Sequence, residues 1–515
     1  MSTKKTVSII TSTLPPQHGG RTKSLLQRAR IFSRHNIKTK IYTTNYNENY
    51  DEVYARFTAE GKVNDDIEMY NIYDYYRGDS KKTPSNYQSF IDKELSTLSP
   101  AHPDEPCGLK RVKGSHVTAY YTGGMVQYHV STNTETGKVK NVDFYQPYFK
   151  ESVARAYTNN NENVHKISYF EPITKRLIAD VFLTNDFHPY VTREYTYNGE
   201  KKKLARVILN QGKDKINVFP NEREFFAHWL EELFSDGDIV ICDARLLDWP
   251  LLNVSKDVRK IFQLHSTHLS DPLNVNSPLR SDFATLLERD LKPSEIIISL
   301  TNIQKKEMIA RLNNIANNTV SIPHSIKTHD IEYPANMKQI CIVTRLTMLK
   351  KVQHAIKAFN LFNFVKKGYT LVIYGEGDDL KRQQEVIAHR KLNDKVLLKG
   401  FTSKPEQIFE GSAFSLLTSA YEGFPLSVLE SMSRGCPVIS YDIRYGPAEM
   451  LDSKSGRIAK WNRPLGLAWE MYKEANNPRS RDEVRARAKR YSEEAFFEKW
   501  SKLLVDEPLD LKDVT

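Results

Sequence analysis

The chain has 515 residues, 40% of them apolar and 27% charged, which is the balance of an ordinary globular protein. Its length predicts two to four domains. The formal net charge of +11 favours anionic partners, namely phosphate polymers, nucleic acid or an anionic membrane face. No window approaches the ~18 apolar residues of a membrane-spanning helix, and the N-terminal apolar run is too short for a signal peptide. We therefore expect a cytoplasmic protein.

The first elements are typical of a parallel α/β sheet. A buried-strand pattern at Thr6–Thr11 leads into the loop Leu14–Arg21, a helical pattern at Thr22–Ser33 and a second strand at Ile37–Thr43. The pair Gly19–Gly20 in this loop would let the backbone approach a ligand closely, although a tight turn without a ligand explains two glycines equally well.

From about Tyr75 to Asp214 the helix–strand alternation fades. Short segments rich in Val, Ile, Tyr and Phe are separated by turn clusters, which predicts an antiparallel β-meander inserted into the first α/β domain. The expected strands are Val117–Tyr121, Met125–Ser131, Val142–Tyr148, Lys166–Phe170, Leu177–Leu183 and Leu204–Leu209. An insertion of this kind either carries solvated loops or supplies an oligomer contact or a polymer-docking surface.

The α/β pattern resumes with a helix at Glu222–Phe234 and a strand at Asp238–Cys242. The triplet Asp236-Gly237-Asp238 has the spacing of a cation-binding DxD motif, but its place before a buried strand favours a plain turn. The four cysteines (Cys107, Cys242, Cys341 and Cys436) form no CxxC pair. Neither a zinc site nor a disulfide framework is therefore indicated, and reduced, buried thiols are expected.

Two histidines follow the next expected strand, Val258–Leu264. In an open parallel sheet, ligands bind beyond the carboxyl ends of the strands, which is where His265 and His268 stand. A pair that only caps the loop backbone is the alternative. The strand Glu295–Leu300, the helix after Thr301 and the strand Val320–Ile322 complete this half of the chain.

The second half begins another α/β unit. Strands are expected at Gln339–Val343, Tyr369–Tyr374, Val396–Leu398, Phe414–Thr418 and Val438–Tyr441, with a helix at Val352–Phe364. Arg345 and Lys350 follow the first of these strands, where a guanidinium and an ammonium could neutralise a diphosphate. A solvated basic loop is the simpler explanation of this pair taken alone.

The stretch Tyr421–Gly446 is the centre of the predicted site. Pro425 is expected to be the first residue of a helix with Leu426, Leu429 and Met432 on its apolar face. The unpaired amides and positive dipole at a helix start bind anions. Two carboxylates, on Glu422 and Glu430, could accept protons from hydroxyl groups, so the stretch suits a phosphorylated sugar.

Taken together, R-x4-K at Arg345 and Lys350, YGEG at 374–377, LKGF at 398–401 and E-x7-E at Glu422 and Glu430 resemble the retaining glycosyltransferases of family 4. The resemblance implies the GT-B fold, with two Rossmann-like domains facing a cleft. The β-rich insertion, HSTH at 265–268 and DIRYGP at 442–447 look like the subfamily that α-glycosylates wall teichoic acid. Glycosyltransferases of the accessory secretion system share the insertion and much of the motif set.

The resemblance implies a role for each matching residue. Glu422, His265, Arg345 and Lys350 would act on the transferred sugar and the departing UDP, with His268 as the second choice for the histidine. The implied donor-binding residues are Gly19, Gly20, Thr402, Ser403, Gly423, Phe424, Leu426, Ser427 and Glu430. Glu430 would hold the ribose, and Thr402 and Ser403 would lie by the nucleobase. No metal or other cofactor is expected where Arg and Lys carry the phosphate charge.

The pattern and the resemblance together divide the chain. Residues 1–75 and 215–333 are expected to form the N-terminal Rossmann-like acceptor domain, and residues 76–214 the β-rich insertion. Residues 334–490 are expected to form the nucleotide-sugar domain, and residues 491–515 a C-terminal helix and tail.

The implied activity is transfer of glucose or GlcNAc from a UDP-sugar to hydroxyls of a poly(polyol-phosphate) chain, with an α linkage. O-glycosylation of a Ser/Thr-rich adhesin and non-catalytic polymer binding on a degenerate GT-B scaffold are the alternatives. Nucleic acid is not expected, because no concentrated Lys/Arg–aromatic stripe is present. By resemblance we expect a homotrimer, and the charge is compatible with peripheral contact at the inner membrane face.

Overall fold

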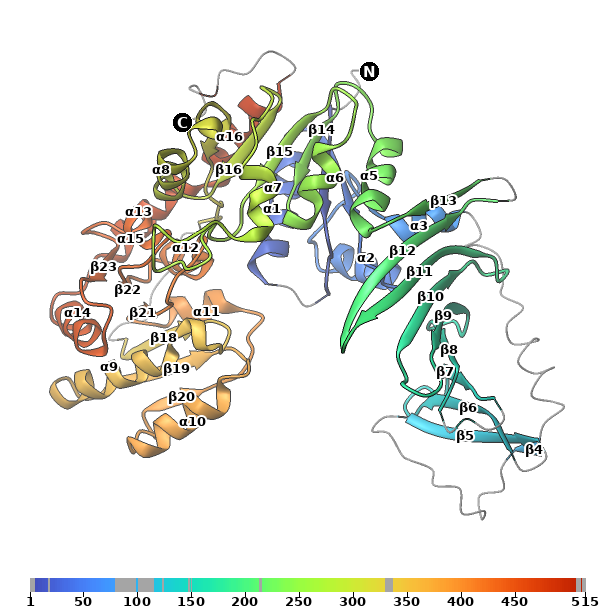
Figure 1. Ribbon diagram of the computed structural model, residues 1–515. Coiled ribbons are helices and arrows are strands. Elements are labelled where there is room, and N and C mark those ends of the chain that lie inside the picture. Colours follow the sequence, from blue (N-terminus) through green and yellow to red (C-terminus); the bar gives the residue numbers. More distant parts are fainter. Residues whose placement is uncertain are drawn as a thin grey trace.

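The computed structural model contains two parallel α/β domains and one antiparallel sheet (Figure 1). It describes residues 5–16, 19–78, 99–100, 115–122, 125–146, 149, 151–212, 215–328, 337–505 and 511. The antiparallel sheet extends from the N-terminal domain on the side away from the C-terminal domain (Figure 1).

The N-terminal domain is built on a seven-stranded parallel sheet, in the order β17-β16-β15-β14-β1-β2-β3. Its central strands are buried on both faces, which explains their continuous runs of Ile and Val. The strands are β1 (Lys5–Thr11), β2 (Ile37–Thr43), β3 (Ile67–Asn71), β14 (Ile239–Cys242), β15 (Arg259–Gln263), β16 (Glu295–Ser299) and β17 (Thr319–Ser321). The helices are α1 (Gly20–Arg34), α2 (Tyr50–Ala59), α3 (Ile72–Arg77), α5 (Glu222–Leu233), α6 (Asp248–Leu252), α7 (Ser281–Leu287) and α8 (Asn302–Arg311).

The last helix of the chain, α16 (Glu493–Leu503), packs on this N-terminal domain. The buried indole of Trp500 meets Phe32 of α1 edge to face at 5.6 Å, and Arg28 lies over the same indole at 5.0 Å. On the helix surface, Arg34 Nη1 donates to Glu493 Oε2 (2.7 Å). The two ends of the described chain therefore share one hydrophobic core.

The inserted region forms a ten-stranded antiparallel sheet, in the order β13-β12-β11-β10-β9-β8-β7-β6-β5-β4. Its strands are β4 (Ser99–Pro100), β5 (Ser115–Thr122), β6 (Met125–Asn133), β7 (Val139–Phe144), β8 (Ala154–Thr158), β9 (Val164–Phe170), β10 (Leu177–Leu183), β11 (Pro189–Asn198), β12 (Lys201–Asn210) and β13 (Ile216–Phe219). All six segments expected to be strands lie in this sheet, although the one expected to reach Tyr148 ends at Phe144. The sheet continues to Phe219, beyond the expected limit of the insertion at residue 214.

The C-terminal domain has a six-stranded parallel sheet, in the order β20-β19-β18-β21-β22-β23. Its strands are β18 (Gln339–Val343), β19 (Thr370–Tyr374), β20 (Val396–Leu398), β21 (Phe414–Leu417), β22 (Val438–Tyr441) and β23 (Gly456–Ala459). The helices are α9 (Val352–Val365), α10 (Leu380–His389), α11 (Pro405–Glu410), α12 (Leu426–Ser433), α13 (Pro447–Met450), α14 (Pro464–Asn476) and α15 (Arg481–Ala488).

Helix α12 begins one residue later than expected, because Pro425 is its N-cap. The backbone of Pro425 is extended, at φ −78° and ψ 90°, and its carbonyl accepts from the amide of Val428 (3.0 Å). Helix α1, in contrast, begins earlier than expected, because Gly19 is its N-cap and Gly20 is already helical. The predicted loop therefore ends earlier, and the glycine pair forms the start of a helix.

Two structural interpretations made from the sequence are confirmed. Asp236-Gly237-Asp238 is a turn: Gly237 has φ +84°, Asp236 accepts from the amide of Asp257 (2.7 Å), and Asp238 accepts from the amide of Ser235 (2.8 Å). Three of the cysteines, Cys242, Cys341 and Cys436, are buried free thiols. Cys107 lies outside the described residues.

Candidate active site

A charged pair forms the base of the C-terminal half of the site. Lys350 ends a short 3-10 turn after β18, and its Nζ donates to Glu422 Oε1 at 2.6 Å. Ser419 Oγ donates to the same carboxylate oxygen, also at 2.6 Å. Both members of the ion pair are largely buried, with exposed side-chain fractions of 15% and 14%. The Glu422 carboxylate is therefore fixed in position and already neutralised by a cation.

The loop that holds Glu422 is fastened to the N-terminal domain. The amide of Glu422 donates to the carbonyl of Arg444 (2.7 Å), and the amide of Tyr445 donates back to the carbonyl of Glu422 (2.8 Å). The side chains of Arg444 and Tyr445 both donate to the Glu307 carboxylate on α8, at 2.7 and 2.6 Å. Glu307 thus couples the position of this loop to the opposite domain.

Two glycines bring the domains into direct contact at the site. A Cβ added to Gly423 would collide with the carbonyl of His265, and one added to Gly20 would lie 2.8 Å from Cδ1 of Leu426. At Gly423 the obstacle is backbone, so no larger side chain fits without movement of the opposite domain, whereas at Gly20 the Leu426 side chain would have to shift. The structure therefore brings together the glycine pair, His265, and the start of α12.

Glu430 faces the N-terminal domain, where it forms an ion pair with Lys23 of α1. Lys23 was not among the predicted site residues. Its place shortly after the Gly19–Gly20 pair, on the first turn of a helix, was the signal that could have identified it. The carboxylate expected to hold a ribose is thus paired with a cation from across the cleft.

Arg345 differs from Lys350 in its exposure and in its pairing. Its side chain is exposed, and within the ranges that the structure describes no carboxylate lies at ion-pairing distance from it. The backbone on either side of Arg345 packs against the YGEG loop. Gly375, at φ +143°, lies against Thr344, and Gly377, at φ +150°, lies against Leu346. The amide of Leu346 donates to the carbonyl of Glu376 (2.8 Å).

The remaining predicted donor residues lie around this core. Thr402 and Ser403 are in the loop before α11, which adjoins the YGEG loop through the hydrogen bond from Gly375 N to Gly400 O (2.7 Å). Thr402 Oγ1 accepts from the amide of Lys404 (3.1 Å). The ring of Phe424 is buried against His324, with centroids 5.6 Å apart, so only its backbone is available to a ligand. Leu426 and Ser427 form the first turn of α12, which has no side-chain cap.

His265 is held by a buried charged pair that the sequence reasoning missed. Its Nε2 lies 3.3 Å from Oδ1 of Asp243, whose Oδ2 accepts from Arg28 (2.7 Å). Burial would raise the pKa of Asp243, but Arg28 and His265 outweigh it and hold this pKa below its ordinary value. Asp243 directly follows β14, at the same carboxyl edge of the sheet as His265. Because ligands bind beyond the carboxyl ends of parallel strands, this position could have identified Asp243 as a site residue.

The histidines at the domain boundary are kept neutral by burial. Burial lowers the pKa of His265 against the opposing effect of Asp243, and it lowers the pKa of His324, whose ring stacks with His265 at 5.7 Å. Burial also lowers the pKa of His268 to about 4. His268 stacks on Tyr445 at 6.3 Å and does not line the cavity described below, whereas His265 does.

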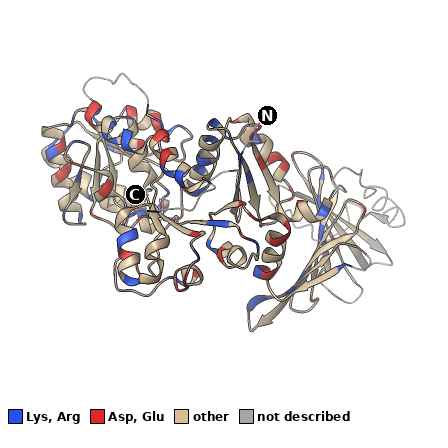
Figure 2. Cartoon of the chain, turned by 90° about the horizontal axis from the view of Figure 1, so that it is seen from above, with Lys and Arg blue, Asp and Glu red and all other residues tan. Residues whose placement is uncertain are grey.

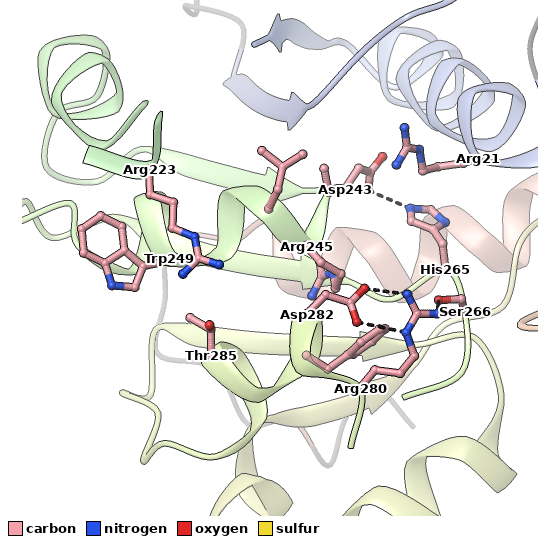
Figure 3. Close-up of a pocket in the computed structure, with 13 residues that line it drawn as sticks. Arg21, Arg223, Asp243, Arg245, Trp249, His265, Ser266, Arg280, Asp282 and Thr285 are labelled. Atoms are coloured by element: carbon pink, nitrogen blue, oxygen red, sulfur yellow. Dashed lines mark hydrogen bonds and ion pairs between the residues drawn. The ribbon is translucent and has the colours of Figure 1, made fainter. Parts of the chain in front are cut away.

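Beyond His265 the N-terminal domain contains a cavity of ≈ 400 Å³ (Figure 3). Its lining includes four arginines from different elements. The lining residues are Arg21, Arg223, Asp243, Ala244, Arg245, Leu246, Trp249, His265, Ser266, Arg280, Asp282, Phe283 and Thr285. Within the part of the chain that the structure describes, no group of three or more His, Cys, Asp or Glu side chains could hold a metal ion.

The fold and motifs define a class of protein. Residues 327–493 match the model of the glycosyl transferases group 1 family. The chain therefore contains a group 1 glycosyltransferase domain, and its two facing parallel domains have the GT-B fold that the resemblance implied. The antiparallel sheet is an insertion in the N-terminal domain of this fold.

Particular relatives extend over nearly the whole chain. The poly(ribitol-phosphate) alpha-N-acetylglucosaminyltransferase of Staphylococcus aureus (strain COL) is 24% identical over 97% of this chain and 99% of its own length. The poly(glycerol-phosphate) alpha-glucosyltransferase of Bacillus subtilis (strain 168) is 24% identical over 96% of this chain and 74% of its own. The crystal structure of a mutant of S. aureus TarM with fondaparinux, alpha-GlcNAc-glycerol and UDP superimposes with a TM-score of 0.83, at 22% identity, over 97% of this chain and 99% of that one. The resemblance to the teichoic acid glycosyltransferases is thereby confirmed.

Proposed function

We propose that this protein transfers a hexose, glucose or GlcNAc, from a UDP-sugar to hydroxyl groups of a poly(polyol-phosphate) chain of the wall teichoic acid type. The observation that carries the proposal is the contact of Gly423 with His265, which places the Lys350–Glu422 pair beside the arginine-lined cavity. One side of this contact suits a sugar diphosphate and the other a polyanion. The relatives named above act on such acceptors.

The proposed reaction retains the anomeric configuration and gives an α linkage. Arg345 and Lys350 would stabilise the negative charge that develops on the departing UDP, mostly in the transition state. Glu422 would accept hydrogen bonds from hydroxyls of the transferred sugar, and neutral His265 would form a further hydrogen bond to it. In same-face attack, the leaving phosphate oxygen takes the acceptor proton as the C1–oxygen bond to phosphate breaks and the new glycosidic bond forms.

A defined panel tests this proposal. Purified protein is incubated with UDP-glucose, UDP-GlcNAc and UDP-galactose, each with poly(glycerol-phosphate), poly(ribitol-phosphate) or a Ser-rich peptide, and released UDP and the product anomer are measured. We expect an α-linked product on one of the two polymers. Transfer to the peptide alone would replace the proposal with protein O-glycosylation, and a β-linked product would refute retention.

We further propose that the reaction needs no metal, because Arg345 and Lys350 supply the charge that a divalent cation would otherwise carry. Excess EDTA should leave the rate of UDP release within about twofold of the untreated rate, since this arginine and lysine bind phosphate without a metal. A loss restored by Mg²⁺ or Mn²⁺ would contradict this.

A peripheral contact with an anionic membrane face is also proposed, at the cytoplasmic side. Its support is a surface between α9 and α14, at the outer edge of the C-terminal domain (Figure 1). Phe364, Leu465 and Trp469 are 85%, 64% and 59% exposed there, and Lys473 lies over the Trp469 ring. Exposed aromatic rings flanked by lysines are typical of interfacial binding. No helix among the described residues is long and apolar enough to span a membrane.

Sedimentation with vesicles tests this contact. The protein should bind vesicles of phosphatidylglycerol more tightly than vesicles of phosphatidylcholine, and Phe364→Ser with Trp469→Ser should remove the binding while leaving transfer to free polymer intact. Failure of the wild-type protein to bind phosphatidylglycerol vesicles would refute the membrane contact, and equal binding by the double variant would refute the assignment of this surface.

We propose that the antiparallel sheet mediates a homotrimer. Tyr169 on β9 and Ile178 on β10 are 43% and 45% exposed, which leaves apolar side chains on neighbouring strands uncovered within one subunit. Light scattering of the full chain should give three times the subunit mass, and Ile178→Asp should reduce it. A monomeric wild-type protein would refute the trimer.

A further inference from the structure

The arginine-lined cavity has more positive charge than its own carboxylates neutralise. Arg280 forms a two-pronged ion pair with Asp282, at 3.0 and 2.7 Å. Arg245 lies 3.0 Å from Asp248 and donates to two backbone carbonyls at 3.2 Å. The other carboxylate in the lining, on Asp243, is paired with Arg28, outside the cavity. Each acidic group near the cavity is therefore already paired.

Two arginines of the lining remain available to an anion. Arg21 donates to the hydroxyl of Ser12, at 3.3 Å, and has no carboxylate at ion-pairing distance among the described residues. Arg223, exposed at the start of α5, has no carboxylate within ion-pairing distance among the residues that the structure describes. Figure 3 shows Arg223 and Trp249 at one end of the cavity and Arg21 and His265 at the other, with Arg245 between them. The cavity therefore presents spaced guanidinium groups along its length.

This concentration of charge is local. Figure 2 shows Lys and Arg interspersed with Asp and Glu over the helices of both parallel domains. In this view the positive residues of the two parallel domains form no broad patch, so we expect a polyanion to be recognised at particular places. Arginine suits this task because its planar guanidinium can form two parallel hydrogen bonds to phosphate oxygens.

The position of the cavity separates it from the diphosphate of the donor. Arg345 and Lys350, which would bind that diphosphate, belong to the C-terminal domain, whereas every lining residue of the cavity belongs to the N-terminal domain. His265 stands at the boundary, with its backbone against Gly423 and its ring in the cavity wall. An anion bound in the cavity therefore lies on the acceptor side of the reacting sugar.

From this geometry we propose that the cavity binds a phosphodiester of the acceptor chain adjacent to the polyol unit that receives the sugar. Arg21 and Arg223 bind its oxygens, and the indole of Trp249 provides an apolar wall for the carbon chain of the polyol. Arg245 and Arg280 are fixed by their aspartates and shape the cavity wall. This inference rests on the proposed function, and it makes Arg223 a residue that selects phosphate-containing acceptors over neutral polyols.

Arg223→Gln tests the subsite, because this side chain is exposed and lies at the end of the cavity away from His265 (Figure 3). The KM for poly(glycerol-phosphate) or poly(ribitol-phosphate) should rise about tenfold, as expected for the loss of one charge-assisted hydrogen bond. The KM for the UDP-sugar should change less than the KM for polymer, and Arg223→Lys should recover part of the loss. Arg382→Gln, an exposed arginine on α10, serves as the matched control and should change neither constant.

Calorimetric binding of short glycerol-phosphate oligomers, without donor, gives a readout that does not depend on transfer. The wild-type protein should bind the oligomers, and Arg223→Gln should bind them more weakly with a smaller dependence on salt. If the wild-type protein glycosylates a polymer but Arg223→Gln has an unchanged KM and unchanged oligomer binding, the subsite is wrong and the proposed function stands. If the wild-type protein neither binds nor glycosylates any polyol-phosphate, both are wrong.

Discussion

The two sides of the cleft differ in how their charges are balanced before any ligand is present. On the C-terminal side, Lys350 is already paired with Glu422, in a contact from which most solvent is excluded. On the N-terminal side, Arg21 and Arg223 line a cavity and have no carboxylate partners among the residues that the structure describes. Under the proposed function, the first arrangement fixes groups that would act on the sugar donor. The second leaves charge available for the phosphate groups of the proposed polymer acceptor.

Glu422→Ala removes the carboxylate from the C-terminal side of the cleft and should lower the transfer rate more than any other substitution considered. Transfer should fall by about 10³-fold or more, because the sugar loses a fixed hydrogen-bond acceptor and Lys350 loses its partner. UDP release with polymer measures the loss, and circular dichroism checks the fold. Glu385→Ala, an exposed carboxylate on α10, is the control. Near-normal turnover by Glu422→Ala would remove this residue from the site.

Arg345→Ala and Lys350→Ala separate the two cations of the donor side. Each should lower kcat by on the order of 10²-fold, as expected for the loss of charge stabilisation in the transition state. Lys350→Ala should also lower thermal stability, because it leaves the largely buried Glu422 without its cation, whereas Arg345→Ala should not. Steady-state kinetics and thermal melting distinguish the two variants. A change confined to KM would show that these cations bind donor and transition state equally.

Acid should lower the free energy of unfolding, because buried neutral histidines lie where the two domains meet. His268 has a folded-state pKa of about 4, below the ~6.5 of an unfolded histidine, so the unfolded chain binds more protons between these values. Stability is therefore complete above pH ~6.5 and should fall by about 1.4 kcal/mol per pH unit for this histidine as the pH drops toward 4. Burial of His265 and His324 acts in the same direction. Denaturant unfolding at several pH values measures the slope.

His268→Gln provides the comparison for that measurement. Its unfolding free energy should depend less steeply on pH between 6.5 and 4 than that of the wild-type protein. Identical slopes would mean that His268 is not buried as a neutral group.

Lys23→Gln should have the smallest effect, because this ion pair joins a half-exposed lysine to Glu430 across the cleft. If Glu430 binds the ribose of the donor, Glu430 has to separate from Lys23 when the nucleotide enters. The KM for the UDP-sugar should then fall by about twofold to threefold, in keeping with the modest energy of exposed ion pairs. An increase in KM would instead indicate that Lys23 itself contacts the nucleotide.

Strands that are buried on both faces could be predicted from the sequence with their bounds. Gln339–Val343 and Val438–Tyr441 match the structure, because short, mostly apolar runs of this kind are typical of buried strands. Ile37–Thr43 also matches, through the alternation that buries Ile37, Thr39 and Ile41. The strands Ala154–Thr158 and Pro189–Asn198 were missed. They lie in a half-exposed antiparallel sheet, where polar residues such as those of TREYTYN at 192–198 hide the alternation.

The motifs of the predicted donor site could be found in the sequence because the residues of each motif lie close together in the chain, as in Glu422–Gly423 or Arg345–Lys350. The contacts that complete the site are not local. Leu426 meets Gly20 across some four hundred positions of sequence, and nothing near either residue indicates the other. Arg223 reads as an ordinary charge on a helix, and only the folded chain shows that it faces the same cavity as His265.

The return of the C-terminal helix to the N-terminal domain has a mechanical consequence. The chain crosses between the domains twice, and the amide of Ile326 in one crossing donates to the carbonyl of Tyr491 in the other, at 2.8 Å. Two crossings that are hydrogen-bonded to each other restrain the relative orientation of the domains more than a single tether would. We therefore expect any movement between the domains to preserve the approach of Gly20 to Leu426 and of Gly423 to His265.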